Sequence, residues 1–152
     1  LCDSPAGIEK GAFLAMYFAD RAVVVVNPEV SSVRDSDRIL GLLASKTKKA
    51  EAGERITEHL LLTRYNPARV EKGEMLSISD VEEILGLKVV GVIPEAPEVL
   101  QSSNSGNPVI LDEESSAGQA YTDAVARILG EERPMRFTTV EKKGFFSKIF
   151  GA

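Results

Sequence analysis

The feature that most constrains the fold is a run of four valines in the segment 21–27, RAVVVVN, which stops at Asn27-Pro28. Continuous β-branched runs are typical of strands that are buried on both faces, as in a parallel sheet. Two further apolar runs follow, HLLLT at 59–63 and KVVGVI at 88–93, and each stops close to a proline. The sequence therefore predicts three short strands with a breaker at the end of each.

Helical patterns separate these three runs. Apolar residues recur at helical spacing over 33–49 and 115–129, and shorter helices are expected over 8–18 and 79–85. The alternation of strand and helix predicts an α/β fold with a partial doubly wound, mostly parallel sheet. Ligands of such sheets bind at the carboxyl ends of the strands, so the residues that follow each strand are the candidate site residues.

Length and composition restrict the class of protein. The chain of 152 residues can form one domain with its own core, and 43% hydrophobic and 27% charged residues are ordinary for a globular protein. No apolar run has the length of a membrane span. The single cysteine, Cys2, allows no intrachain disulfide. Residues 1–3 are interpreted as the end of a buried strand whose beginning is missing, and hence the sequence as a piece of a longer chain.

The charge is distributed unevenly along the chain. The formal net charge is −5, and the segment 142–152 holds three lysines and no acidic residue, so residues 1–141 carry −8. An acidic body does not suit a protein that binds nucleic acid through phosphate contacts, and no nucleic-acid partner is expected.

The final segment, KKGFFSKIFGA, contains three of the six phenylalanines. On a helix its apolar side chains gather on one side. Lys143 and Lys148 flank that side, and Lys142 lies nearer its middle, where its long side chain can still reach water. The pattern predicts an amphipathic helix over 141–152 that binds an anionic membrane surface, with docking on its own domain as the alternative. The residues predicted to bind membrane are Lys142, Lys143, Phe145, Phe146, Lys148, Ile149 and Phe150.

Short signals follow the predicted strands. In DSPAG, at 3–7, a carboxylate precedes a glycine turn, and this pair suits the water shell of Mg²⁺ and the approach of backbone N–H groups to a phosphate. The amide of Asn66 offers a donor and an acceptor together, which suits the edge of a purine. Pro94 ends the third strand. Each signal alone is more typical of a turn or a helix cap, and only their combination, in this order and at these intervals, favours a nucleotide site.

Five segments together resemble the ParA/MinD family of ATPases, also called the deviant Walker A family. They are DSPAG, NPEVSSVRDSDRI, LLLTRYNPARV, GVIPE and the final KKGFFSKIFGA. The resemblance extends over essentially all of the chain. It implies the doubly wound fold of P-loop NTPases, with ATP and Mg²⁺ as cofactors.

The resemblance also implies roles for single residues. Asp3 would support Mg²⁺ through water, with Pro5 to Gly7 as the switch that senses the γ-phosphate, and Asn66 and Pro94 would contact adenine. Proteins of this kind form a homodimer with ATP, bind the membrane through the final helix, recruit a MinC-type division inhibitor and are stimulated by a MinE-type activator. Candidates for contact with these partners are Arg34, Asp35 and Asp37, for which a solvated helix face is an equally good interpretation.

One departure from the family pattern is large. The Gly-rich P-loop that grips the phosphates in this family has no counterpart in the 152 residues. We therefore expect the chain to lack a central strand of the sheet, and to hydrolyse no ATP by itself. Its predicted organisation is residues 1–130 as the later part of an ATPase domain, 131–140 as a linker and 141–152 as the membrane helix.

The resemblance predicts an ATP-dependent regulator of septum placement, cytoplasmic and peripheral on the inner membrane. Two alternatives stay open. One is an ATPase that partitions DNA or plasmids, which shares the fold, and the other is a non-catalytic binding module anchored to a membrane.

Overall fold

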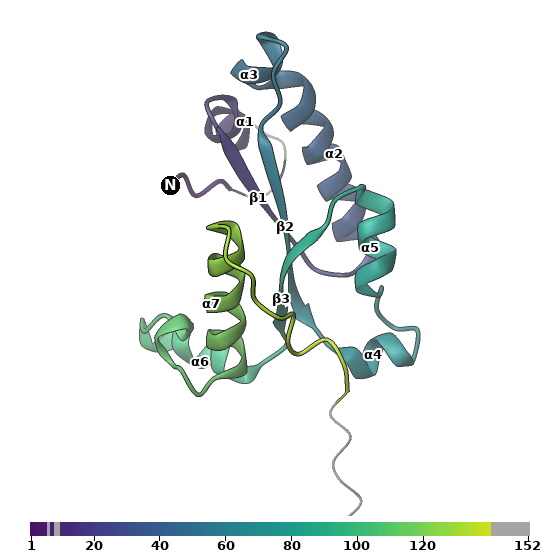
Figure 1. Ribbon diagram of the computed structural model, residues 1–152, viewed down its shortest axis with the longest axis vertical. Coiled ribbons are helices and arrows are strands. Elements are labelled where there is room, and N and C mark those ends of the chain that lie inside the picture. The colour runs from purple at the N-terminus through teal and green to yellow at the C-terminus, as the bar shows by residue number, and fades with distance from the viewer. Residues whose placement is uncertain (6, 8–9, 141–152) are drawn as a thin grey trace, which may run out of the picture.

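A computed structural model describes residues 1–5, 7 and 10–140 of the chain (Figure 1). Helices and strands alternate along most of it, and the described elements, in chain order, are α1 (Lys10–Tyr17), β1 (Arg21–Val26), α2 (Val30–Lys46), α3 (Lys48–Glu51), β2 (Thr57–Tyr65), α4 (Pro67–Glu71), α5 (Ile78–Leu85), β3 (Val89–Pro94), α6 (Pro97–Ser105), the 3₁₀ turn η1 (Val109–Leu111) and α7 (Ser116–Ile128).

The three strands form a parallel sheet in the order β1-β2-β3. Arg21 pairs with Thr57 at the start of β1, and Leu61 of β2 stands beside Gly91 of β3. The prediction of an α/β fold with a parallel sheet is therefore confirmed, and each of the three predicted strands is present. Helices lie between the strands in sequence, as parallel connections require.

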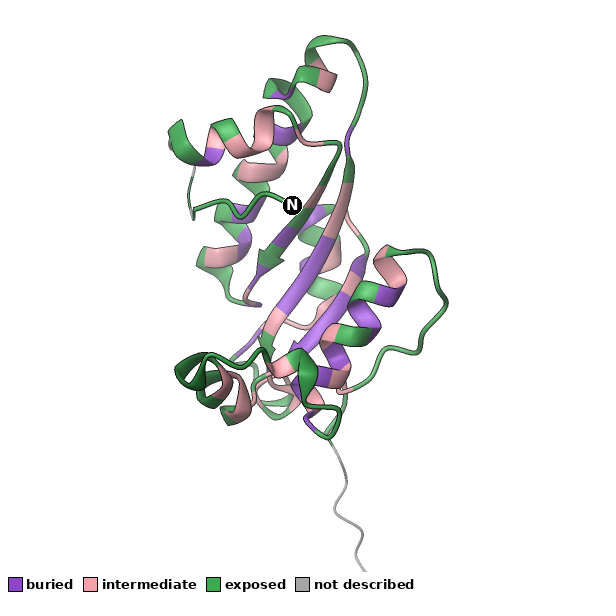
Figure 2. Cartoon of the chain, turned by 90° about the vertical axis from the view of Figure 1, so that its left-hand side faces the viewer, coloured by how far each residue is buried: buried purple, intermediate pink, exposed green. Residues whose placement is uncertain are grey.

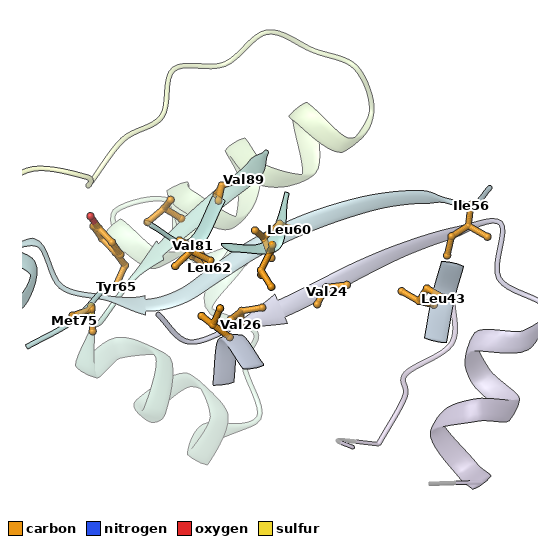
Figure 3. Close-up of a cluster of buried hydrophobic side chains, with 13 residues drawn as sticks. Val24, Val26, Leu43, Ile56, Leu60, Leu62, Tyr65, Met75, Val81 and Val89 are labelled. Carbon is orange, nitrogen blue, oxygen red and sulfur yellow. The ribbon is translucent and has the colours of Figure 1, made fainter. Parts of the chain in front are cut away.

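One face of the sheet is covered by α2 and α5. Leu60 and Leu62 of β2 are fully buried there, in one cluster with Val33 and Leu43 of α2 and Val81 of α5. Figure 3 shows much of this cluster, in which side chains from the strands and from the helices on that face converge. This is the larger of the two hydrophobic clusters, and it forms the core of the described structure.

The other face is covered by α7, which packs on β2 and β3. Leu61 and Ile93 meet the small side chains of Ala117, Ala120 and Ala124. The approach is close, since a Cβ placed on Gly91 would lie 2.5 Å from Cβ of Ala124. Glycine at this position lets the helix lie directly on the strand.

Two predictions about buried strands are wrong. In β1, Val24 and Val26 are buried, but Val23 is 43% and Val25 is 59% exposed, because α7 covers β2 and β3 and leaves this side of β1 open. Residues 1–3 form no strand, and Cys2 is exposed. A strand requires a neighbour with which to exchange hydrogen bonds, and residues 1–3 pair with neither edge strand of the described sheet. Figure 2 shows the mixed burial of the strands and the exposed N-terminal segment.

Helix boundaries differ from the sequence predictions at several points. Helix α2 begins at Val30 instead of Val33, so Ser32 lies inside its first turn, where its hydroxyl accepts a hydrogen bond from the backbone N–H of Asn27 at 3.2 Å. The short helices α3, α4 and α6 had no prediction. Residues 131–140 contain neither helix nor strand.

Within the described ranges, no helix combines the length and apolar character that crossing a membrane requires.

Candidate functional site

The carboxyl ends of β2 and β3 bring two predicted site residues together. Tyr65, the last residue of β2, pairs with Pro94, the last residue of β3. The backbone N–H of Glu95 donates to the carbonyl oxygen of Tyr65 at 2.9 Å, which fixes the two strand ends relative to each other. Asn66 and Pro94, 28 positions apart in the sequence, therefore occupy adjacent positions at one edge of the sheet.

The side chain of Asn66 is held from both ends. Its Oδ1 accepts hydrogen bonds from the backbone N–H groups of Ala68 at 3.1 Å and Arg69 at 3.3 Å, so it caps α4. Its Nδ2 donates to Oε2 of Glu95 at 3.2 Å. The carbonyl side of the amide is thus occupied by the protein, and the second Nδ2 hydrogen is the group that can donate to a purine nitrogen. The sequence predicted that the Asn66 amide offers both a donor and an acceptor to a purine, but the structure leaves only the donor free.

Two charged residues at this edge were missed by the sequence analysis. Glu95 accepts from Asn66 through one carboxylate oxygen, and its other oxygen lies 3.7 Å from an Nη atom of Arg64. Arg64 has a φ of 56°, in the left-handed region that few residues other than glycine adopt, at an irregular part of the pairing between β2 and β3. Proximity in the sequence to Asn66 and Pro94 was the only available signal for either residue.

A second polar pair lies at the ends of β1 and β2. Oγ1 of Thr63 donates to Oδ1 of Asn27 at 2.9 Å, and both residues are half-buried. The carbonyl oxygen of Pro28, next to Asn27, accepts from the backbone N–H of Leu76 at 3.0 Å. The strand ends are thus joined to each other and to the loop before α5. In the sequence, Asn27 is notable only as the end of the first apolar run.

The predicted Mg²⁺ and switch residues lie in the N-terminal segment. Asp3, Pro5 and Gly7 are exposed, and no hydrogen bond or ion pair of the described residues links them to Asn66 or Pro94. Gly7 has a φ of 96°, which glycine adopts without strain, and this agrees with a turn in that position. No group of three or more His, Cys, Asp or Glu residues in the described part of the chain is arranged to hold a metal ion. The Mg²⁺ role of Asp3, through water, stays a prediction.

The predicted partner-binding residues form an exposed face of α2. Arg34, Asp35 and Asp37 point away from the core, while Val33 and Ser36 of the same turns are buried. The carboxylate of Asp35 lies 3.5 Å from the guanidinium group of Arg38 in a highly exposed pair. Such a pair contributes little to stability, so these charges are available to a partner. The structure is equally compatible with the solvated face that the sequence left open.

The seven residues predicted to bind membrane, from Lys142 to Phe150, lie outside the described residues.

Comparison with known proteins identifies the family of this chain. The chain is 66% identical over 152 residues to the septum site-determining protein MinD of Escherichia coli K12, and the match covers 99% of this chain and 56% of the relative. The corresponding protein of Neisseria meningitidis MC58 is 62% identical over 151 residues, with the same coverage. The chain belongs to the MinD family. It spans about half the length of the curated relatives it matches. No protein-family model matches it.

Solved structures of MinD proteins have the same fold. The MinD cell division protein of Aquifex aeolicus superposes with a TM-score of 0.79 at 42% identity, covering 88% of this chain and 54% of that one. A MinC:MinD complex from the same organism gives 0.79 at 41% identity over 91% of this chain and 54% of that one. MinD of Pyrococcus horikoshii, complexed with Mg-ADP, gives 0.69 at 25% identity over 83% and 48%. The resemblance read from the five sequence segments is therefore confirmed, and so is the partial P-loop NTPase fold.

Proposed function

We propose that this chain is part of an ATP-dependent, membrane-associated regulator that determines where the division septum forms. The observation that carries the proposal is the 66% identity, over 99% of the chain, to the septum site-determining MinD of E. coli. The joined strand ends at Asn66 and Glu95 support it, because ligands of parallel α/β sheets bind at this edge.

In this proposal ATP binds with its adenine at the ends of β2 and β3. The free Nδ2 hydrogen of Asn66 donates to the base, and Pro94 forms part of its apolar wall. Glu95 keeps the Asn66 amide in one orientation, so the donor is prepared before the nucleotide arrives. Asp3 holds the water shell of Mg²⁺, which neutralises phosphate charge when bound. The phosphate grip comes from the family's Gly-rich P-loop, which is not within these 152 residues.

The membrane step in this proposal belongs to the final segment. Phe145, Phe146, Ile149 and Phe150 enter the interface, and the three lysines face anionic lipid headgroups. One short helix binds weakly, because it must also be nucleated. ATP-driven dimerisation presents two copies, and effective concentration then raises avidity by about 10² to 10⁴. The protein would be cytoplasmic and peripheral on the inner membrane.

The exposed face of α2 is the proposed contact for a MinC-type inhibitor and a MinE-type activator. Arg34, Asp35 and Asp37 provide an exposed set of charges without strong internal partners. The likeness to MinD in an Aquifex aeolicus MinC:MinD complex supports a partner of the first kind.

A chimera tests the proposal. The P-loop-containing portion of the E. coli relative is joined to this chain, and three quantities are measured: ATP hydrolysis, binding to anionic vesicles with ATP or ADP, and restoration of midcell division in cells that lack their own MinD. We expect ATP-dependent hydrolysis and vesicle binding, and normal septa. Vesicle binding that is the same with ATP and ADP, or septa that stay misplaced, would contradict the proposal. Binding of the chimera to DNA instead of vesicles would favour the DNA-partitioning alternative.

Two sets of variants of the chimera test the proposed roles of single residues in membrane binding and in adenine binding. Phe146→Glu should abolish vesicle binding and leave nucleotide binding intact, whereas Phe18→Glu, the same change at an exposed phenylalanine in the described part, should leave both intact. Asn66→Asp keeps the oxygen that caps α4 but removes the amide donor. Combined with Glu95→Gln, which avoids two facing carboxylates, it should weaken ATP binding, and unchanged affinity would exclude the adenine role of Asn66.

A further inference from the structure

A cavity lies between α6, η1 and α7, and neither Asn66 nor Pro94 is among its lining residues. Its volume is about 490 Å³, and its apolar walls include Val99 of α6, Val109 and Ile110 of η1, and Tyr121 of α7. Ile110 is 39% exposed, and Leu111, next to it, is 74% exposed. Apolar side chains lining an open hollow indicate a binding surface more often than scattered apolar residues do.

An acidic hollow adjoins this cavity. It has a volume of about 440 Å³, shares Asn107 and Pro108 with the first, and is lined by Glu98 and Asp112. The Oε2 atom of Glu98 is buried and has no hydrogen-bond partner among the described residues. A buried carboxylate oxygen without a donor is unfavourable, so this position calls for a cationic or donor group. The combined surface therefore fits a ligand that is both apolar and basic.

The last described residues run along the flank of α7 opposite to this surface (Figure 1). Nε of Arg136 donates to Oδ2 of Asp123 at 2.6 Å, and its Nη1 donates to Oε1 of Gln119 at 2.7 Å, so residue 136 is fixed beside the first half of α7. Phe137 packs against the same buried cluster as Tyr121, a wall of the cavity. Phe146 follows Val140, the last described residue, by six positions and can lie up to about 20 Å from it. This is enough to pass around a helix of about 10 Å diameter.

We propose that the final segment, residues 141–152, docks on this surface of its own chain when it is not bound to a membrane. The phenylalanines and Ile149 of the segment fill the apolar cavity, and its lysines face Glu98 and Asp112. The segment joins three phenylalanines with three lysines and no acidic residue beyond Glu141, a combination that matches both hollows. The same side chains cannot occupy the cavity and a lipid interface together, so docking opposes membrane binding and holds the single copy in a closed state.

Cross-linking tests the docking directly and does not depend on the proposed membrane function. The full 152-residue chain, with p-benzoylphenylalanine in place of Phe146, is irradiated in dilute solution without lipid. We expect intrachain cross-links to α6 or η1, identified by mass spectrometry. Cross-links between two chains would show that a second copy is the occupant, and cross-links to any other part of the chain would place the segment elsewhere. Either result would overturn the proposal.

Three variants test the competition with membrane. Ile110→Glu puts a charge in the cavity, and Ser103→Trp fills it from an exposed wall position. Ile84→Glu is the matched control, because Ile84 is 53% exposed on α5. If about two thirds of the free chain is docked, loss of docking should raise the affinity for phosphatidylglycerol vesicles about threefold, while the control stays unchanged.

The cross-linking and vesicle-binding results together distinguish a failure of docking from a failure of the proposed membrane function. The regulatory part of the inference rests on that function. If the two cavity variants lose the cross-link but no variant binds vesicles, docking stands and the membrane proposal fails. If both cavity variants fold normally by circular dichroism and keep the cross-link and the vesicle affinity of the unmodified chain, the docking proposal fails.

Discussion

Helices cover the two faces of the sheet to different extents. On the face of α2 and α5, Leu60, Leu62 and Val26 are fully buried, and helices cover all three strands. On the other face, α7 covers β2 and β3, but Val23 and Val25 of β1 stay exposed. The four valines are chemically identical, so the difference is decided by which helices this chain supplies. The open side of β1 is where we expect the other half of a full-length MinD-type protein to pack.

The largest difference between the faces should appear on truncation of their side chains. Leu60→Ala removes a fully buried side chain from the covered face and should lower the free energy of unfolding by about 4 kcal/mol. Val25→Ala on the open face should cost about 0.5 kcal/mol or less. Urea unfolding of the 152-residue chain measures both. In the chimera the cost of Val25→Ala should rise to about 1 to 2 kcal/mol, and equal costs in the two proteins would show that nothing covers β1.

Removal of Arg136 tests how α7 is held on the second face. Asp123 is buried on α7 with a side chain 7% exposed, and Arg136 is its ion-pair partner. Arg136→Met should cost about 3 kcal/mol, because it leaves a buried carboxylate unpaired. The double variant with Asp123→Asn should recover a large part of this loss in thermal unfolding. If the double variant is as unstable as Arg136→Met, the packing of the arginine stem matters more than its charge.

A methyl group between β3 and α7 should disturb the second face alone. Gly91→Ala places a Cβ 2.5 Å from that of Ala124 and 2.7 Å from Cδ1 of Leu61, and should cost about 2 kcal/mol. Adding Ala124→Gly makes room for it, so the double variant should lose less than the sum of the two single variants. Additive losses in urea unfolding would contradict the direct contact of helix and strand.

The smallest effect concerns a charge on the first face. The hydrogen bond from the ammonium group of Lys88, and then that from the backbone N–H of Val89, lower the pKa of Glu82 below its ordinary value of 4.5. Its stabilising effect is therefore present above the ordinary carboxyl pKa and is lost as pH falls through the lowered one. Glu82→Gln should cost about 1 kcal/mol at neutral pH, since Lys88 is 90% exposed, and almost nothing at about pH 3. A cost that does not change with pH would exclude the charge as its cause.

The candidate site was only partly predictable. Asn66 and Pro94 were singled out because each lies at or shortly after the end of an apolar run, and the position of a breaker after a strand can be read locally. Glu95 and Asn27 were missed as structural partners, because their contacts join residues 29 and 36 positions apart in sequence. The short helix α4 was missed for a related reason, since the Asn66 side chain that caps it had been assigned to a turn and to adenine.

The sequence by itself determined the three strands, the order of helix and strand, and the family, because β-branched runs, breakers and motif residues are local properties of the chain. Only the tertiary structure decided which valines are buried, which hydrogen of Asn66 is free, and that an apolar cavity with an acidic neighbour lies between α6, η1 and α7. These depend on where α7 and the ends of β2 and β3 come to lie in space. Burial and hydrogen bonding are set by neighbours that are distant in sequence, and no local pattern records them.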